Sequence, residues 1–487
     1  MKLSKLLKAA GIEAKPGGAD PNITAVVEDS RRVSKGALFV AYKGVHDDGG
    51  RYIKAAVAKG AVAVAAEGKR TPPAGAVLVP VKNGRHAAAD LARAFHGNPG
   101  AKLRLAAVTG TKGKTTTTFL VRAVAEAAGE ATGLSGTVAT VVGGELRLST
   151  LTTPGASDLQ ASLAAMVAAG AKAAVVEVSS HAIDQGRVAG LSFDSAIFTN
   201  LYPDHLDYHR DMESYFAVKS RLFVGDEAAR DVVVNADDAY GRKLLLARPD
   251  AMSFGEWAEA PVRAERIEAD ARGVRVVMTT PAGRLTVDSP LLGRYNAWNL
   301  MAAAAWGLKR GFELPVIGRA LESVKVVPGR MERVDAGQEY LAVVDFSHTG
   351  PALEAALKAL RALTRSRLIV VFGCGGDRDP DRRRTMGEAA AKLADVAIIT
   401  SDNPRDEDPL KIIASIERAA RSAHGPACRM VFPDRTAAIG EAVKMADKGD
   451  VVLVAGKGHE TVQIVGAKRI PFDDREVLKR AIAGKPE

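Results

Sequence analysis

Short apolar runs alternate with alanine-rich amphipathic stretches along most of the chain. The clearest apolar runs are residues 173–178, 195–199, 232–235, 368–372, 396–400 and 451–455. Strands that are buried on both faces of a sheet read as continuous apolar runs, and their alternation with helices indicates a mostly parallel sheet. We therefore predict three-layer α/β folds for the middle and last parts of the chain, and a mixed α/β fold for the first part.

Two groups of helix-breaking residues divide this pattern. Residues 96–100 (His-Gly-Asn-Pro-Gly) separate a helix-like stretch at 87–95 from a predicted strand at 103–108. Residues 327–330 (Val-Pro-Gly-Arg) precede a predicted strand at 341–346. A chain of 487 residues is too long for one ordinary core and suggests about three domains. The predicted domains are residues 1–99, 100–330 and 331–487.

The composition is that of a globular enzyme, with 47% hydrophobic and 25% charged residues. The apolar runs are far shorter than the roughly 20 residues that a membrane span requires. Charged residues also interrupt the first positions, where a secretory signal needs an apolar segment. We therefore expect a cytoplasmic protein without membrane insertion. Cys374 and Cys428 are the only cysteines, which excludes a disulfide framework and a cysteine-based zinc site.

The net charge of +10 suits a polyanionic ligand, either nucleic acid or a phosphorylated small molecule. Basic residues are spread along the chain and aromatic residues make up only 5%, so a platform for stacking single strands is not expected. We expect no nucleic-acid partner. The charge alone leaves one alternative open, a phosphate-loop NTPase without ligase activity that binds nucleic acid in a salt-sensitive manner.

A glycine-rich segment follows the predicted strand at 103–108. Its residues are Thr109, Gly110, Thr111, Lys112, Gly113, Lys114, Thr115 and Thr116. A helical pattern at 117–128 comes next, and strand, glycine-rich turn and helix are the context of a phosphate-binding loop. We predict that Lys114 reaches the β- and γ-phosphates and that Thr115 or Thr116 places a hydroxyl on Mg²⁺. Val108 stands where the general pattern has a glycine, so the loop is a shortened variant.

Acidic residues and histidines follow the next two predicted strands. Glu177 lies at the end of the strand at 173–178, where a carboxylate beside a phosphate loop can hold Mg²⁺. His205 lies in an acid- and histidine-rich segment after the strand at 195–199, a pattern typical of a metal loop and also of a capped surface turn. Lys219 has helical neighbours and would by itself be read as a solvated lysine.

These motifs, in this order, resemble the Mur ligases, ATP-dependent amide-forming enzymes of peptidoglycan synthesis, and most closely the MurE-type tripeptide synthetases. The resemblance covers nearly the whole chain, from residues 29–33 (Asp-Ser-Arg-Arg-Val) to 455–460 (Ala-Gly-Lys-Gly-His-Glu). It implies an N-terminal domain for the UDP moiety, a central phosphate-loop ATPase and a C-terminal Rossmann-like domain that admits an amino acid. It also implies the cofactors ATP and Mg²⁺, and we expect a monomer.

The resemblance assigns the nucleotide and metal site residue by residue. Lys112 stands where the family's ATP loop more usually has asparagine. Glu177 and His205 correspond to Mg²⁺ ligands, and Lys219 to a lysine that carbamylation turns into a carboxylate-like ligand. Further implied nucleotide contacts are Asn296, Asn299, Arg330, Asp345 and His348. Gly350 replaces a proline of the family, which leaves the loop of His348 less rigid.

The resemblance also implies two sets of substrate contacts. Those for UDP-MurNAc-L-Ala-D-Glu are Ser30, Thr152, Thr153, Ser179, Gln185 and Arg187. Those for the added diamino acid are Arg378, Asp402, Asn403, Arg405, Gly456 and Glu460. Meso-diaminopimelate has a distal carboxylate that lysine and ornithine lack; Arg405 suits that group and Glu460 suits the distal ammonium. We therefore favour meso-diaminopimelate. If Arg405 holds the α-carboxylate instead, L-lysine or L-ornithine stays open.

The implied reaction has two steps. The γ-carboxylate of D-glutamate attacks the γ-phosphate of ATP, and the amine of the diamino acid then displaces phosphate from the acyl phosphate. Because two anions meet in the first step, charge neutralisation carries most of the catalysis. The predicted catalytic residues are Lys114, Glu177, His205 and Lys219. The alternative is another enzyme of the same superfamily, such as folylpolyglutamate synthetase or a sibling Mur ligase. The segments 152–154 and 402–405 argue against it.

Overall fold

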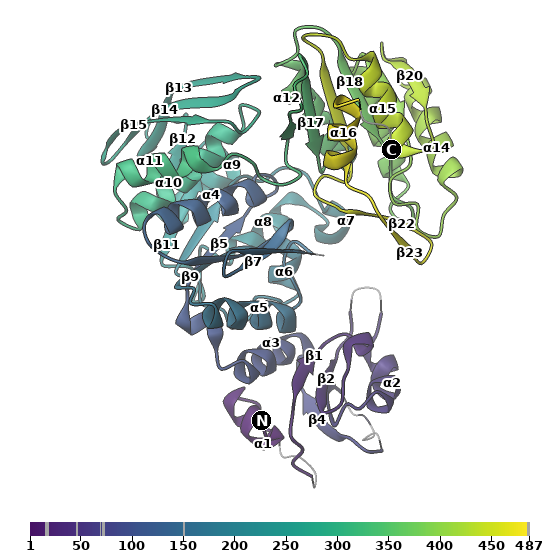
Figure 1. The fold of residues 1–487 in the computed structure, drawn as a ribbon. Coiled ribbons are helices and arrows are strands. Elements are labelled where there is room, and N and C mark those ends of the chain that lie inside the picture. The colour runs from purple at the N-terminus through teal and green to yellow at the C-terminus, as the bar shows by residue number, and fades with distance from the viewer. Residues whose placement is uncertain (15–18, 45–46, 69, 71–73, 150, 485–487) are drawn as a thin grey trace. The chain divides into compact units, whose positions relative to one another are not determined.

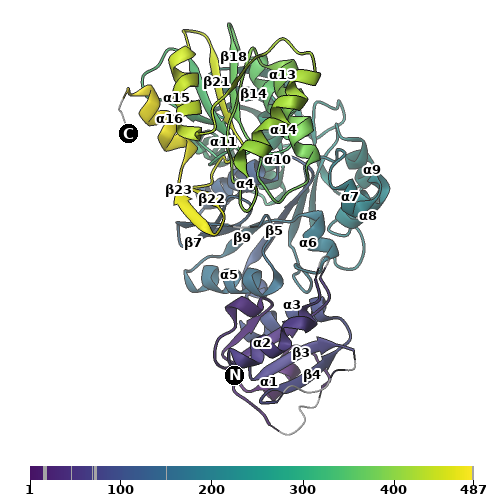
Figure 2. The same ribbon diagram turned by 90° about the vertical axis from the view of Figure 1, so that its right-hand side faces the viewer.

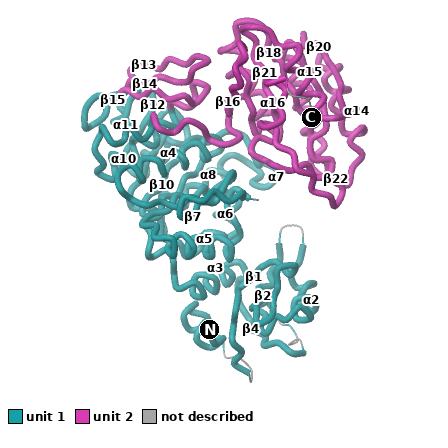
Figure 3. The backbone as a smooth tube through the Cα atoms, viewed as in Figure 1, with its two compact units in different colours: residues 1–264, 278–285, 298–321 teal, residues 265–277, 286–297, 322–487 magenta. Residues whose placement is uncertain are grey.

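A computed structural model describes residues 1–14, 19–44, 47–68, 70, 74–149 and 151–484. Within these residues three main β-sheets, each with its own helices, and a separate two-stranded hairpin are present (Figures 1 and 2). This is the predicted three-domain α/β class. By its internal contacts the chain forms two compact units (Figure 3). Unit 1 comprises residues 1–264, 278–285 and 298–321, and unit 2 comprises residues 265–277, 286–297 and 322–487.

The first sheet is parallel throughout, in the order β1-β2-β3-β4. Its strands are β1 (Ala25–Val27), β2 (Ala37–Ala41), β3 (Ala63–Glu67) and β4 (Val77–Val81). The helices are α1 (Leu3–Ala9), α2 (Ile53–Ala58) and α3 (Gly84–Phe95), with 3-10 turns η1 (Ser30–Arg32) and η2 (Gly49–Tyr52). Apolar side chains of α1 and α3 pack on one face and those of α2 on the other. Every residue of β2 is therefore buried.

The central sheet places β5 between β9 and β10, in the order β12-β11-β10-β5-β9-β6-β7-β8 within unit 1. Its strands are β5 (Arg104–Thr109), β6 (Thr132–Ser135), β7 (Ala139–Val142), β8 (Glu145–Leu148), β9 (Ala173–Glu177), β10 (Ser195–Phe198), β11 (Asp231–Asn235) and β12 (Met252–Gly255). The pairs from β12 to β6 are parallel, and β7 and β8 are antiparallel. Val108 pairs with Glu177 and Thr109 with Phe198. The segments that follow β5, β9 and β10 therefore leave the sheet at one edge, where ligands of parallel α/β sheets bind.

Helices cover both sides of this sheet, with α4 and α5 on opposite sides of β5 and β9 (Figures 1 and 2). They are α4 (Lys114–Ala127), α5 (Ala156–Ala168), α6 (Ser180–Asp184), α7 (Leu206–His209), α8 (Met212–Ser220), α9 (Ala239–Ala247), α10 (Asn296–Lys309) and α11 (Leu314–Ser323), after the 3-10 turn η3 (Pro99–Lys102). The remaining strands are β13 (Val262–Asp270), β14 (Gly273–Thr280) and β15 (Gly283–Ser289). The predicted helix at 117–128 begins earlier, at Lys114, because Gly113 takes a φ of 85° at the turn into the helix.

The third sheet is doubly wound, with the order β16-β17-β21-β18-β19-β20 and only β16 antiparallel. Its strands are β16 (Glu332–Val334), β17 (Leu341–Asp345), β18 (Leu368–Phe372), β19 (Val396–Ile399), β20 (Cys428–Val431) and β21 (Val451–Ala455). The helices α12 (Gly350–Arg361), α13 (Asp381–Leu393) and α14 (Pro409–Ser422) cover one face. The helices α15 (Arg435–Met445) and α16 (Asp474–Ile482) cover the other. The hairpin consists of β22 (Val462–Val465) and β23 (Lys468–Pro471).

No helix among the described residues is both long enough and apolar enough to cross a lipid bilayer.

Candidate active site

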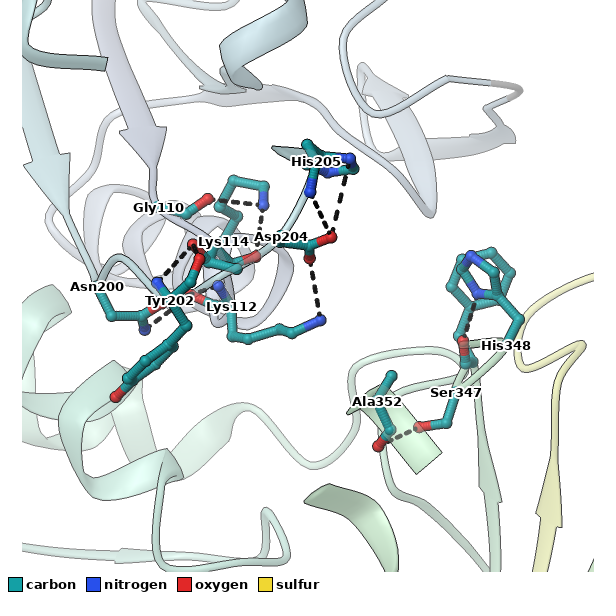
Figure 4. A network of polar contacts seen from close by, with 12 residues as sticks. Gly110, Lys112, Lys114, Asn200, Tyr202, Asp204, His205, Ser347, His348 and Ala352 are labelled. Carbon is teal, nitrogen blue, oxygen red and sulfur yellow. Dashed lines mark hydrogen bonds and ion pairs between the residues drawn. The ribbon is translucent and has the colours of Figure 1, made fainter. Parts of the chain in front are cut away.

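The phosphate-binding loop lies between β5 and α4, as the sequence predicts. Gly110 has a φ of 145°, and a Cβ at this position would lie 2.0 Å from Thr199 Oγ, so only glycine fits. The Lys114 amine donates to the carbonyl oxygens of Gly110 and Thr111, both at 3.0 Å (Figure 4). The loop is therefore closed around the lysine that we predict to bind phosphate.

The residues after β10 hold this loop from the side. Asn200 accepts a hydrogen bond from the Lys112 N–H at 2.9 Å through its side-chain oxygen, and its amide donates to the Lys112 carbonyl at 3.1 Å (Figure 4). The Lys112 amine lies 3.5 Å from a carboxylate oxygen of Asp204. Asn200 is not among the residues predicted from the sequence, although its position soon after a predicted strand was a usable signal.

The Glu177 carboxylate lies at the base of the loop and is completely buried. It accepts hydrogen bonds from the Thr115 hydroxyl at 3.2 Å, and from the N–H and the hydroxyl of Thr137, both at 2.9 Å. A Cβ on Gly136 would lie 2.3 Å from Glu177 Oε1. The loop between β6 and β7 therefore fixes this carboxylate beside the phosphate loop, and Thr137 is a site residue that the sequence analysis missed.

Lys219 extends from α8 toward the start of the phosphate loop and is 1% exposed. Its amine donates to the Thr109 hydroxyl at 3.2 Å and to the Gly110 carbonyl at 3.0 Å, and lies 5.0 Å from the centre of the Tyr215 ring. Burial lowers the pKa of Lys219 well below its ordinary value, and the nearby Lys114 adds to the effect, while Asp204 opposes it. The site therefore favours the neutral amine.

His205 lies at the start of α7 with a φ of 55°. Its ring meets the His181 ring edge-on, with centroids 4.8 Å apart. The main-chain N–H of His205 donates to Asp204 Oδ1 at 3.0 Å (Figure 4). Burial lowers the pKa of His205 to about 4, with Asp204 opposing the shift. The imidazole is therefore neutral near pH 7, which is the form that binds metal ions.

The predicted magnesium ligands supply only part of a cation site as they stand. Glu177 and the Thr115 hydroxyl provide hard oxygen donors, and His205 a neutral nitrogen. Among the described residues no group of three or more His, Cys, Asp or Glu could hold a metal. The Lys219 amine is a hydrogen-bond donor and offers no oxygen ligand to a metal ion. These residues fit Mg²⁺ when Lys219 carries a carboxylate-like group and phosphate or water completes the ligand set.

Five of the six residues predicted for the acceptor substrate gather next to Glu177. The Thr153 hydroxyl donates to the Glu177 main-chain carbonyl at 2.7 Å and accepts from the Ser179 N–H at 3.1 Å. Arg187 donates to the Thr153 carbonyl at 3.0 Å and to Gln185 Oε1 at 2.6 Å. The Thr152 and Thr137 hydroxyl oxygens lie 3.0 Å apart. The sixth residue, Ser30, begins η1 in the N-terminal domain.

The residues predicted for the amino acid lie in unit 2, in the segments after β18, β19 and β21. The Asn403 amide donates to Glu460 Oε2 at 2.8 Å, and the Arg405 guanidinium donates to the Gly376 carbonyl at 2.6 Å. A Cβ on Gly456 would lie 2.6 Å from Asp402 Oδ2. Burial, Arg405 and Arg382 lower the pKa of Arg378. Lys457, which is not among the predicted residues, contacts both Asn403 and Glu460.

The residues predicted to contact the rest of the nucleotide are divided between the two units. In unit 1, Asn299 accepts from the Thr117 hydroxyl at 3.2 Å and would lie 2.5 Å from a Cβ on Gly113. In unit 2, the Arg330 guanidinium lies 5.2 Å from the centre of the Phe346 ring. The other three residues also lie in unit 2. The Asn296 amide donates to the Leu292 carbonyl at 2.7 Å, and Asp345 accepts from the Met331 N–H at 2.8 Å. His348 Nδ1 lies 2.8 Å from the Phe346 carbonyl oxygen (Figure 4).

Comparison with known proteins gives matches over nearly the whole chain. Residues 22–96 match the catalytic domain of the Mur ligase family, residues 108–307 the Mur ligase middle domain, and residues 329–458 the Mur ligase glutamate ligase domain. A UDP-N-acetylmuramoyl-L-alanyl-D-glutamate–2,6-diaminopimelate ligase of Solibacter usitatus is 44% identical over 472 residues, covering 96% of this chain and 95% of that protein.

Two further relatives agree. A protein of the same name from Synechococcus elongatus is 45% identical over 479 residues, covering 95% of each chain. A solved structure of a ligase of that name matches 99% of both chains, with a TM-score of 0.67 and 31% identity. The chain therefore belongs to the Mur ligase family.

Proposed function

We propose that this ligase adds meso-diaminopimelate to the D-glutamate of UDP-MurNAc-L-Ala-D-Glu, with conversion of ATP to ADP and phosphate. One observation carries the proposal: Glu177 links the two predicted sites. Its carboxylate accepts from Thr115 of the phosphate loop, and its main-chain carbonyl accepts from Thr153 of the acceptor group. The last residue of β9 therefore contacts both the predicted phosphate-binding loop and the predicted acceptor site. The names of relatives at 44% and 45% identity support the same substrates.

The chemistry requires that the acceptor carboxylate and the γ-phosphate approach each other although both are anions. The loop N–H groups and the Lys114 ammonium supply positive charge where negative charge concentrates in the transition state. Arg187, which already donates to the Thr153 carbonyl at 3.0 Å, orients the acceptor. The amine of diaminopimelate then attacks the acyl carbon and phosphate leaves. The acyl phosphate must be shielded from water between the steps.

Mg²⁺, when bound, supplies further charge neutralisation on the phosphates. Thr115, Glu177, His205 and Lys219 would hold it, the last as a carbamate. In carbamylation the neutral amine forms an N–C bond with CO₂ and releases one proton, so an uncharged nitrogen group becomes an anionic oxygen ligand. The lowered pKa of Lys219 supports this step because it favours the reactive neutral amine.

Each of the three predicted domains contains one of the three main sheets, which supports a division of labour among them. Residues 1–99, with Ser30, would bind the UDP moiety; residues 100–330 would bind ATP; and residues 331–487 would bind the diamino acid. The substrates are nucleotides and amino acids of the cytoplasm, so the reaction belongs to the cytoplasmic stage of peptidoglycan synthesis. The protein would act as a monomer, without nucleic acid.

The test is mass spectrometry of the product formed from ATP, UDP-MurNAc-L-Ala-D-Glu and each of meso-diaminopimelate, L-lysine and L-ornithine. We expect the tripeptide with diaminopimelate, and phosphate release only when both substrates are present. If product forms only with lysine or only with ornithine, the enzyme adds that amino acid instead of diaminopimelate. Glutamate addition to a folate, or ATP hydrolysis stimulated by nucleic acid without the muramoyl substrate, would overturn the proposal.

A further inference from the structure

Lys457 lies in the loop that follows β21, in unit 2, and its side chain is 0% exposed. A buried ammonium costs much free energy unless hydrogen-bond acceptors and an opposite charge surround it. Lys457 has both. Its amine donates to the Val462 carbonyl at 2.7 Å, to Glu460 Oε2 at 2.9 Å and to Asn403 Oδ1 at 3.1 Å. These three acceptors match the three N–H bonds of an ammonium group.

The two side-chain acceptors of Lys457 also bind each other. The Asn403 amide nitrogen donates to Glu460 Oε2 at 2.8 Å, while its oxygen accepts from the Ile464 N–H at 2.9 Å. The orientation of the Asn403 amide follows from this network, because its oxygen receives two donors and its nitrogen faces a carboxylate. Lys457, Asn403 and Glu460 therefore form a closed triangle that β22 anchors at one corner.

This triangle uses the two oxygens of Glu460 unequally. Oε2 receives both Lys457 and Asn403, whereas Oε1 has no partner among the hydrogen bonds of the described residues. The Glu460 side chain is 34% exposed, so the carboxylate is held from within and open on one side. The positive charge of Lys457 and the hydrogen bond from Asn403 hold it in one orientation.

We propose that Lys457 is a positioning residue for the amino-acid pocket, which holds Glu460 so that Oε1 faces the distal ammonium of the diamino acid. The inference rests on the proposed function, because the ammonium is that of the proposed substrate. Lys457 itself does not touch the amino acid. Its removal leaves Glu460 in the pocket and frees its side chain to rotate, so recognition of the distal ammonium is lost while binding of ATP and of the muramoyl substrate is kept.

The experiment compares Lys457→Met with the wild type in the complete reaction. We expect the KM for meso-diaminopimelate to rise roughly 10- to 100-fold, the range for losing a hydrogen-bonded charge contact. The KM values for ATP and UDP-MurNAc-L-Ala-D-Glu should change less than about twofold. Lys448→Met is the matched control, since Lys448 also pairs with a glutamate, Glu339, but is 77% exposed. Its kinetics should equal those of the wild type.

A second readout separates positioning from general damage to the domain. The substrate 2-aminopimelate keeps the chain and both carboxylates of diaminopimelate but lacks the distal amine. The wild type should prefer diaminopimelate strongly, and Lys457→Met should reduce this preference by roughly tenfold or more. In a Glu460→Gln background the same Lys457 change should have little further effect, because the two residues act as one unit. Should Lys457→Met fail to fold, Lys457→Gln, which retains two N–H donors, serves in the same comparison.

An unchanged preference in a folded Lys457 variant, or an equal loss for both amino acids, would overturn the positioning role. Failure of the proposed function looks different, since the wild type itself would then form no product with diaminopimelate.

Discussion

The Lys219 amine and the Lys114 amine both lie 3.0 Å from the same atom, the carbonyl oxygen of Gly110. Two ammonium groups that share one acceptor repel each other. Because Lys219 is also buried, its neutral form is favoured, and a neutral amine is what reacts with CO₂. This arrangement supports the carbamylation that we propose for Lys219.

Replacement of Lys219 by alanine should lower the rate of ligation roughly 100-fold or more, because a ligand that compensates charge in the transition state is removed. Added acetate or formate should restore part of the activity by providing the missing oxygens. Initial rates with and without the carboxylate measure this. Lys243→Ala, which removes an exposed lysine paired with Glu213, is the control and should be unaffected. Full activity of Lys219→Ala would exclude a carbamate role.

Replacement of Lys114 by alanine should abolish ligation, with a loss of roughly 100- to 1,000-fold or more in kcat. The reason is that Lys114, whose amine donates to the Gly110 and Thr111 carbonyls, is the loop residue that we expect to neutralise charge on the transferred phosphate. Phosphate release assays measure the rate, and the thermal unfolding midpoint serves as the control for folding. Near-normal turnover would show that the loop does not bind the transferred phosphate.

Gly136→Ala should reduce kcat by roughly 100-fold, because a Cβ 2.3 Å from Glu177 Oε1 must push the carboxylate away from Thr115. The same change at Gly440, where the added Cβ meets no atom within 4 Å, is the matched control. Steady-state kinetics of both variants test the prediction. Equal activity of the two variants would mean that the position of Glu177 does not limit the reaction.

The stability of the protein should decrease as the pH falls from about 6.5 toward 4, in part through His459. Burial lowers the pKa of His459 to about 4 in the folded chain, against 6.5 as the ordinary value. Between these pH values His459 is protonated in the unfolded chain but not in the folded chain. Acid therefore lowers the free energy of unfolding, by up to about 3 kcal/mol. Thermal unfolding midpoints of wild type and His459→Phe between pH 4 and 7 measure the effect. The unfolding midpoint of His459→Phe should depend less on pH than that of the wild type. Parallel curves for the two proteins would contradict the lowered pKa of His459.

Arg405→Ala should lower kcat/KM for meso-diaminopimelate roughly 30-fold or more, because the distal carboxylate loses a charged partner. The poor activity expected with L-lysine, which lacks that carboxylate, should change little. The measurement is the ratio of kcat/KM for the two amino acids in wild type and variant. An equal loss for both would instead assign Arg405 to the α-carboxylate.

Much of the fold follows from local sequence. The strands β18 and β21 coincide with the predicted runs at 368–372 and 451–455, because a strand covered on both faces must be apolar at every position. The phosphate loop is equally local, since glycines with φ of 145° and 85° and the lysine that follows them lie within a few residues. By contrast, the roles predicted for Ser30 and Arg405 came from resemblance to a family, because no local pattern distinguishes them from surface residues.

Only the tertiary structure decided which distant residues complete the site. Thr137 reaches the Glu177 carboxylate across 40 residues of sequence, through the pairing of β6 with β9. Lys457 is separated from Asn403 by 54 residues, and in sequence it looks like any solvated lysine. Its burial depends in part on how the loop after β21 packs against the segment after β19 that contains Asn403. The sequence by itself determined the strands and the loop that binds phosphate, whereas packing between distant segments decided which lysines and carboxylates are buried together.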